Sequence, residues 1–152
     1  MDERQKKIDQ LRAFPGSLLK KIEPLSEEQL DIPVRKGEWT VRQIIHHVAD
    51  AHLNGYLRMK LILTETKPIL KPYDQDAWAT LADSRSLIQA SMQMITGLHE
   101  RWADLLSSLS DSDWSKEGVH LENGLVKLDD LLGVYVNHGQ THLDQIDQLN
   151  NP

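Results

Sequence analysis

The chain has 152 residues, which suits a single domain over residues 1–152 with one packed core. Its formal net charge of −6 argues against nucleic-acid binding, because such proteins usually carry a basic surface. It has no cysteine, which excludes disulfides, thiolate metal sites and a nucleophilic cysteine. The first residues do not resemble a signal peptide, and no apolar run reaches the roughly 18 residues that span a bilayer. We therefore expect a cytoplasmic protein with no membrane partner.

The N-terminal half predicts two helices. Apolar residues from Ile8 to Ile22 fit the first, although Pro15-Gly16 should kink it or restart it. Residues 24–38 contain two prolines and a glycine and are predicted to form a loop. The second helix should run from about Val41 to Leu63, because Thr40 and Gln43 have the spacing of an N-terminal capping box.

The C-terminal half predicts two more helices and a hairpin. The third helix should run from Ser84 or Ser86 to about Leu109, after a long connection over residues 65–82. Asn123-Gly124 predicts a small β-hairpin within residues 117–127, and the fourth helix should span roughly residues 128–149. The fold class expected is all-α, a four-helix bundle with a small β-hairpin before the last helix.

Two of the seven histidines have metal-ligand spacing. His138 and His142 lie four residues apart on one face of the last predicted helix, within reach of one ion, and both lie on its inward side. Imidazole nitrogens buried in a bundle must be hydrogen-bonded or ligated. From the pair alone, a metal site and two polar core residues satisfied by neighbours are about equally supported.

A third ligand could come from the helix that follows Thr40. His46 shares its face with Arg42 and Asp50, so we expect it to be solvated or paired with Asp50. His47 and His52 both lie on or beside the apolar face, and periodicity does not choose between them. The remaining two, His99 and His120, have no partner at ligand spacing and are predicted to be surface or loop residues.

Several motifs occur in the order found in one known family. Residues 39–52 (WTVRQIIHHVADAH), 71–78 (KPYDQDAW), 98–102 (LHERW) and 135–139 (YVNHG) resemble the DinB superfamily. The resemblance covers residues from about 11 to 146. It is strongest to the YfiT branch, whose members are regarded as metal-dependent hydrolases and are related to bacillithiol S-transferases.

The resemblance implies a four-helix bundle, generally dimeric, that holds one zinc or nickel ion per subunit through three histidines. By position in the motifs, the ligands would be His47, His138 and His142. The sequence departs from close members at four positions beside the last two ligands, where they usually carry an aromatic residue, arginine and two histidines: Asn137, Gln140, Thr141 and Gln145.

A three-histidine site leaves a coordination position open, which is typical of catalytic rather than structural zinc. Such an ion can activate water for hydrolysis of a small-molecule substrate, or bind a low-molecular-weight thiol as thiolate for transfer. The third alternative is a non-catalytic bundle that only binds a metal or ligand. His52 is a candidate acid–base group or partner of a ligand. Tyr73 is a candidate catalytic residue at the mouth of the site, with Asp74 and Trp78, unless Tyr73 and Trp78 only pack the loop onto the bundle.

Overall fold

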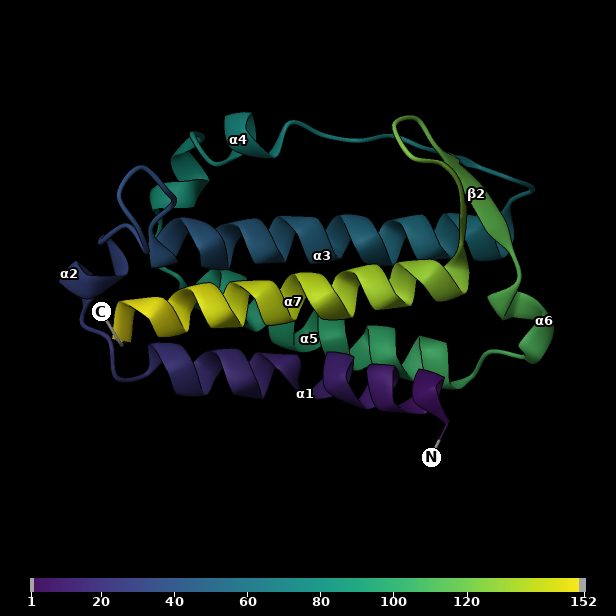
Figure 1. Cartoon of the computed structure of the whole chain (residues 1–152), viewed down its shortest axis with the longest axis horizontal. Helices are drawn as coiled ribbons and strands as arrows, with labels where there is room; N and C mark the ends of the chain where they lie inside the picture. The colour runs from purple at the N-terminus through teal and green to yellow at the C-terminus, as the bar shows by residue number, and fades with distance from the viewer. Residues whose placement is uncertain (1, 151–152) are drawn as a thin grey trace.

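A computed structural model describes residues 2–150 and shows a bundle of four long helices (Figure 1). They are α1 (Glu3–Ile22), α3 (Val41–Thr64), α5 (Gln89–Ser107) and α7 (Leu128–Asn150). α1 packs against α5 and α7, and α3 packs against the same two helices, so α1 and α3 lie diagonally across the bundle. The predicted fold class is confirmed.

The connections carry short elements and a small sheet. These are α2 (Glu27–Leu30), β1 (Ile69–Leu70), α4 (Gln75–Trp78), a 3-10 turn η1 (Ala82–Arg85), α6 (Asp111–Trp114), β2 (Glu117–His120) and β3 (Gly124–Lys127). β2 and β3 form the predicted antiparallel hairpin. β1, which the sequence analysis did not predict, pairs in parallel with β2. None of the helices within residues 2–150 combines the length and apolar character that a membrane crossing needs.

Two predicted helix boundaries differ from the structure. α1 runs without interruption through Pro15, so of the two predicted alternatives, a kink or a restart at Pro15-Gly16, the restart is wrong. α5 begins at Gln89 rather than at Ser84 or Ser86, because residues 82–85 form the tighter turn η1 and Ile88 occupies the N-cap position. Within the predicted loop of residues 24–38, a capping box at Ser26 starts the single-turn helix α2.

The start of α3 follows the sequence signal. The Thr40 hydroxyl accepts from the Gln43 backbone N–H at 3.1 Å, and the Gln43 amide oxygen accepts from the Thr40 N–H at 3.0 Å. This reciprocal cap fixes the first turn of the helix. His46 and His47 lie in its second turn, so the cap also sets where these side chains point.

The apolar core forms two clusters along the bundle. One surrounds the fully buried Trp102, and the other surrounds Ile44 and Ile45 of α3. His52 and His99, both 0% exposed, lie between the clusters. Their rings contact Phe14 on one side and Trp102 on the other. The centre of the bundle is therefore polar and must satisfy its own hydrogen bonds.

Gly55 of α3 allows the Tyr135 ring of α7 to lie directly against the helix backbone. A Cβ atom at Gly55 would meet the Tyr135 ring at 2.4 Å. We expect Gly55→Ala to lower the free energy of unfolding by about 1–3 kcal/mol, since overpacking outweighs the gain of about 1 kcal/mol in helix propensity. Gly97→Ala in α5 is the matched control, because a Cβ there meets nothing within 4 Å and should stabilise slightly. Chemical denaturation measures both, and stabilisation by Gly55→Ala would contradict this packing.

Candidate metal centre

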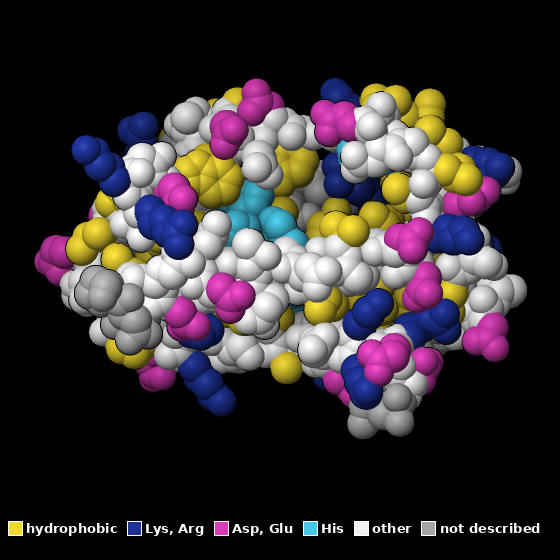
Figure 2. Space-filling view, in the orientation of Figure 1, with side chains coloured by type: hydrophobic (Ala, Val, Ile, Leu, Met, Phe, Trp, Pro, Cys, Tyr) yellow, Lys and Arg dark blue, Asp and Glu magenta, His cyan; other side chains and the backbone are white. Residues whose placement is uncertain are grey.

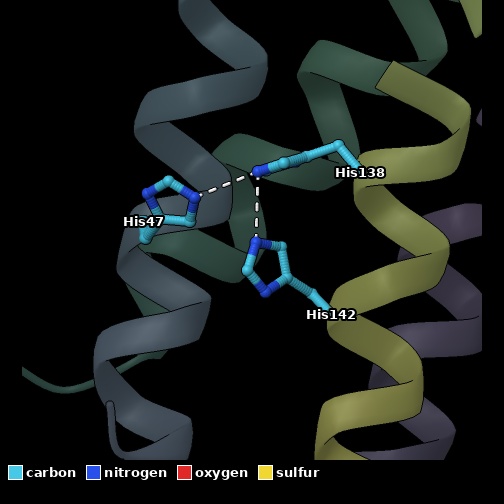
Figure 3. Close-up of side chains that lie close together, drawn as sticks. All are labelled: His47, His138 and His142. Carbon is cyan, nitrogen blue, oxygen red and sulfur yellow. Dashed lines mark hydrogen bonds between the residues drawn. The ribbon is translucent and has the colours of Figure 1, made fainter. Parts of the chain in front are cut away.

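Three histidines from two neighbouring helices converge on one point (Figure 3). His47 projects from α3, and His138 and His142 project from successive turns of α7. The Nε2 atom of His138 lies 3.0 Å from Nε2 of His47 and 3.1 Å from Nε2 of His142. The structure thus brings together the three residues chosen through the family resemblance; that they bind a metal stays a prediction.

The hydrogen-bonding capacity of these rings fits a shared cation. A neutral imidazole has one N–H and one lone pair. His142 Nδ1 donates to the Gln145 amide oxygen at 2.8 Å, which leaves a lone pair on His142 Nε2. His138 Nε2 has two imidazole nitrogens within about 3 Å but only one proton or one lone pair to offer them. A cation among the three Nε2 atoms would satisfy all three lone pairs, so the residues fit a divalent metal.

Burial keeps these rings neutral, as metal ligands must be. Burial, with a smaller contribution from neighbouring imidazoles, lowers the pKa of His47 to about 4 and that of His138 to about 3. The pKa of His142 is also lowered by burial, although its hydrogen bond to Gln145 acts in the opposite direction. At pH 7 the cluster is therefore ready to bind a cation without first losing protons.

The cluster lies in an open cavity with a volume of about 440 Å³. In Figure 2 the histidines form the floor of a hollow on one face of the molecule. The Trp39 ring packs against His47, with ring centroids 4.7 Å apart. Other lining residues come from the loop before α3, from α3, from α4 and from α7: Val34, Glu38, Ile44, Gln75, Asp76, Thr141 and Gln145. A small molecule can thus reach the three rings from solvent.

His52 lies behind the cluster rather than in the cavity. Its Nε2 is 3.0 Å from His138 Nδ1, and its Nδ1 is 2.7 Å from His99 Nε2. Because His52 is 0% exposed, the structure favours its role as a hydrogen-bond partner of His138 over a role as an acid–base group that touches substrate. The prediction that His99 is a surface or loop residue is wrong. His99 is fully buried and donates from Nδ1 to the Leu11 carbonyl at 2.6 Å.

The predictions for His46 and His120 are also wrong. His46 is only 6% exposed, with Nδ1 2.7 Å from the Ser91 hydroxyl and Nε2 2.9 Å from the Ser86 carbonyl. The segment before α5 covers this face of α3, which the sequence pattern predicted to be exposed to solvent. His120 is buried at the end of β2, where its Nδ1 accepts from two backbone N–H groups of the hairpin turn.

Tyr73 is half-buried on the connection between α3 and α5. Its ring packs against Trp78 at a centroid separation of 4.5 Å, and burial raises the pKa of its hydroxyl to about 12. The same connection lines the cavity with Gln75 and Asp76, two residues that the sequence analysis did not single out. They are the first two residues of α4, which begins after its N-cap, Asp74. That capping residue was a local signal for the short helix that carries them. The catalytic role of Tyr73 stays a prediction.

Comparison with known proteins places the chain in a family. Residues 10–146 match the family model described as the DinB superfamily. The chain belongs to the DinB superfamily. It is 43% identical over 142 residues to a Bacillus mycoides protein and 44% identical over 142 residues to a Bacillus cereus protein, each named "Putative metal-dependent hydrolase". Each alignment covers 93% of the chain and 82% of the relative.

Two solved structures show the same fold as this chain. YfiT from Bacillus subtilis, described as "a probable metal-dependent hydrolase with an unusual four-helix bundle topology", matches with a TM-score of 0.94 and 38% identity. The match covers 99% of this chain and 88% of YfiT. A mycothiol-dependent maleylpyruvate isomerase matches with a TM-score of 0.76 at 14% identity, covering 95% of this chain and 61% of that chain, and shares the fold.

In this DinB-superfamily chain, the four positions at which the family resemblance implies a departure from close members are Asn137, Gln140, Thr141 and Gln145 of α7. Gln145 accepts the hydrogen bond from His142, and Thr141 and Gln145 both line the cavity. Gln140 donates to Asp144, and both Asn137 and Gln140 line a second, smaller cavity beside His52 and His99. These four residues therefore bear on the support of one histidine and on the walls of two cavities, and the three nitrogen atoms converge with them in place.

Proposed function

We propose that the protein is a metal-dependent hydrolase of small molecules. In this proposal His47, His138 and His142 hold one divalent ion per subunit, either zinc or nickel. The observation that carries it is the meeting of three Nε2 atoms, two of them 3.0 and 3.1 Å from the third, on the floor of an open cavity. The homodimer implied by the family resemblance stays a prediction.

The bound ion would supply Lewis acidity and would lower the pKa of a water molecule at an open coordination position. The protein's own side chains would orient the ligand rings and accept the proton that the water molecule loses. Gln145 holds the His142 ring through Nδ1, and Trp39 packs against the His47 ring. Glu38 and Asp76 are the carboxylates that line the cavity, so they are candidates to accept a proton from the nucleophile.

The lining limits what the substrate can be. Val34, Trp39 and Ile44 form an apolar part of the wall, while Gln75 and Thr141 offer hydrogen bonds beside the two carboxylates. A volume of about 440 Å³ is at the small end of ligand pockets, which range over roughly 300–1,000 Å³. We infer a small, partly apolar substrate with a carbonyl or comparable electrophilic centre.

An activity screen of metal-loaded protein tests this function. Zinc- and nickel-loaded samples are assayed with ester and amide substrates, and separately with low-molecular-weight thiols plus electrophiles. We expect ester or amide hydrolysis, and a fall of about 10²–10⁴-fold in kcat for Glu38→Gln or Asp76→Asn, whichever is the base. Turnover only with a thiol would replace hydrolysis by thiol transfer. Stoichiometric metal without any turnover would indicate a binding module.

A further inference from the structure

A continuous chain of three hydrogen bonds, part-buried at its first and buried at the other two, runs from the candidate metal centre to the backbone of α1. It begins at His138 Nδ1, which is 3.0 Å from His52 Nε2. The second hydrogen bond joins His52 Nδ1 to His99 Nε2 at 2.7 Å. The third joins His99 Nδ1 to the Leu11 carbonyl oxygen at 2.6 Å. These three hydrogen bonds link α7, α3, α5 and α1, the four long helices of the bundle.

The last member of this chain fixes the direction of every hydrogen bond in it. A carbonyl oxygen only accepts, so His99 must carry its proton on Nδ1 and a lone pair on Nε2. His52 must then donate from Nδ1, which leaves the lone pair of His52 on Nε2. His138 in turn donates from Nδ1, and its Nε2 presents a lone pair to His47 and His142. Neutral rings are required, because a charged imidazole at 0% exposure without a carboxylate partner is costly.

Pro15 explains why the Leu11 carbonyl is available. In an α-helix the N–H of residue 15 donates to the carbonyl of residue 11. Proline has no N–H, so this carbonyl lacks its usual helical partner. A buried carbonyl needs a donor from elsewhere, and His99 provides it. Pro15 thus frees the carbonyl that accepts the last hydrogen bond of the series.

We propose that His52 and His99 are positioning residues that hold His138 in the tautomer with a bare Nε2, and that the Leu11 carbonyl freed by Pro15 sets this direction. The proposal rests on the proposed function only in assigning His138 as a metal ligand. If the two histidines were merely satisfied core residues, their replacement would change stability and leave the proton on His138 where it is. The location of that proton therefore separates the two roles.

The first test needs no metal. Two-bond ¹H–¹⁵N correlation spectra of the metal-free protein at pH 7.5 report which ring nitrogen of each histidine carries the proton. We expect Nδ1–H for His99, His52 and His138. A proton on Nε2 of His138 in the wild-type protein would overturn the proposal. Pro15→Ala, which adds a competing N–H for Leu11, should shift the His99 Nδ1–H resonance upfield; an unchanged resonance would remove Pro15 from the proposal.

The second test compares two variants at His99. Phenylalanine keeps an aromatic ring against Phe14, whose centroid is 5.1 Å away, but offers no acceptor to His52. His52 should then move its proton to Nε2 and donate to His138, which places a proton on the ligand atom of His138. Zinc affinity, measured by competition with a chromophoric chelator, should fall about 10–100-fold in His99→Phe. His99→Gln has an amide oxygen near the position of Nε2 and should stay within about 3-fold of the wild type.

The outcomes are distinguishable. If the folded His99→Phe protein binds zinc as tightly as the wild type, the positioning role is wrong although the metal site stands. If His99→Gln loses as much affinity as His99→Phe, the loss comes from altered packing and the proposal also fails. If the wild-type protein binds neither zinc nor nickel, the proposed function fails, and the spectra of the metal-free protein still decide the tautomer. Circular dichroism confirms that each variant is folded.

Discussion

Replacing His138 by alanine is expected to reduce bound zinc or nickel to less than about a tenth of the wild-type content at equal free metal. His138 is the middle of the cluster, since its Nε2 lies within 3.1 Å of both other Nε2 atoms. Its removal leaves two ligands, whereas catalytic zinc sites use three. His47→Ala and His142→Ala should have similar effects. Elemental analysis of the purified proteins measures the content directly.

His46→Ala is the matched control for this experiment. His46 adjoins His47 in the sequence but points to Ser91 and the Ser86 carbonyl, away from the cluster. The variant should keep its full metal content and lose about 1–3 kcal/mol of stability, because the Ser91 hydroxyl and the Ser86 carbonyl each lose a hydrogen bond to His46. Metal retained by all three ligand variants would refute the three-histidine site, and metal lost from His46→Ala would show that the measurement reports damage to the fold.

Acid should destabilise the metal-free protein already between pH 6.5 and pH 5, where its buried histidines resist protonation. Burial lowers the pKa of His47 and of His99 to about 4, whereas histidines in an unfolded chain titrate near pH 6.5. Between these values the unfolded chain binds more protons than the folded one, so the free energy of unfolding falls as the pH is lowered. Each histidine contributes about 1.4 kcal/mol per pH unit, so these two alone remove about 4 kcal/mol by pH 5.

Urea denaturation of the metal-free protein at several pH values between 7.5 and 5 measures this loss. The pKa values of His52, His138 and His142 are also lowered by burial, which steepens the dependence. His99→Gln serves as the control, because it removes one titrating group and should reduce the slope by about 1.4 kcal/mol per pH unit. A free energy of unfolding that is constant from pH 6.5 to 5 would mean that these rings are not buried in neutral form.

The sequence predicted the long helices well because each carries its own local signals. The capping box at Thr40 and the Asn123-Gly124 turn needed no tertiary information, and both appear in the structure. β1 was missed because a two-residue strand has no detectable periodicity, and its pairing with β2 depends on contacts across about 50 residues. At Pro15 the sequence left a kink and a restart open, because the local cost of proline in a helix does not show whether packing outweighs it.

The histidines show where sequence reasoning stops. Periodicity could not choose between His47 and His52 as the third ligand, because both lie on the side of α3 that faces the bundle. Only the atoms that they contact on other helices distinguish them. His99 could have been found, because it follows Ile95 by four residues and precedes Trp102 by three, on the apolar stripe of α5. His46 could not, because a segment more than 35 residues away covers it.

The connection over residues 71–78 is attached to the rest of the molecule at both ends. β1 joins one end to β2, and at the other end the Gln43 amide donates to the Ala79 carbonyl. Between these attachments, Gln75 and Asp76 form part of the cavity wall without belonging to the bundle core. Insertions, deletions and substitutions in this span can therefore remodel the wall while the helices and their histidines stay unchanged. Such a separation allows one helical scaffold to accept different substrates.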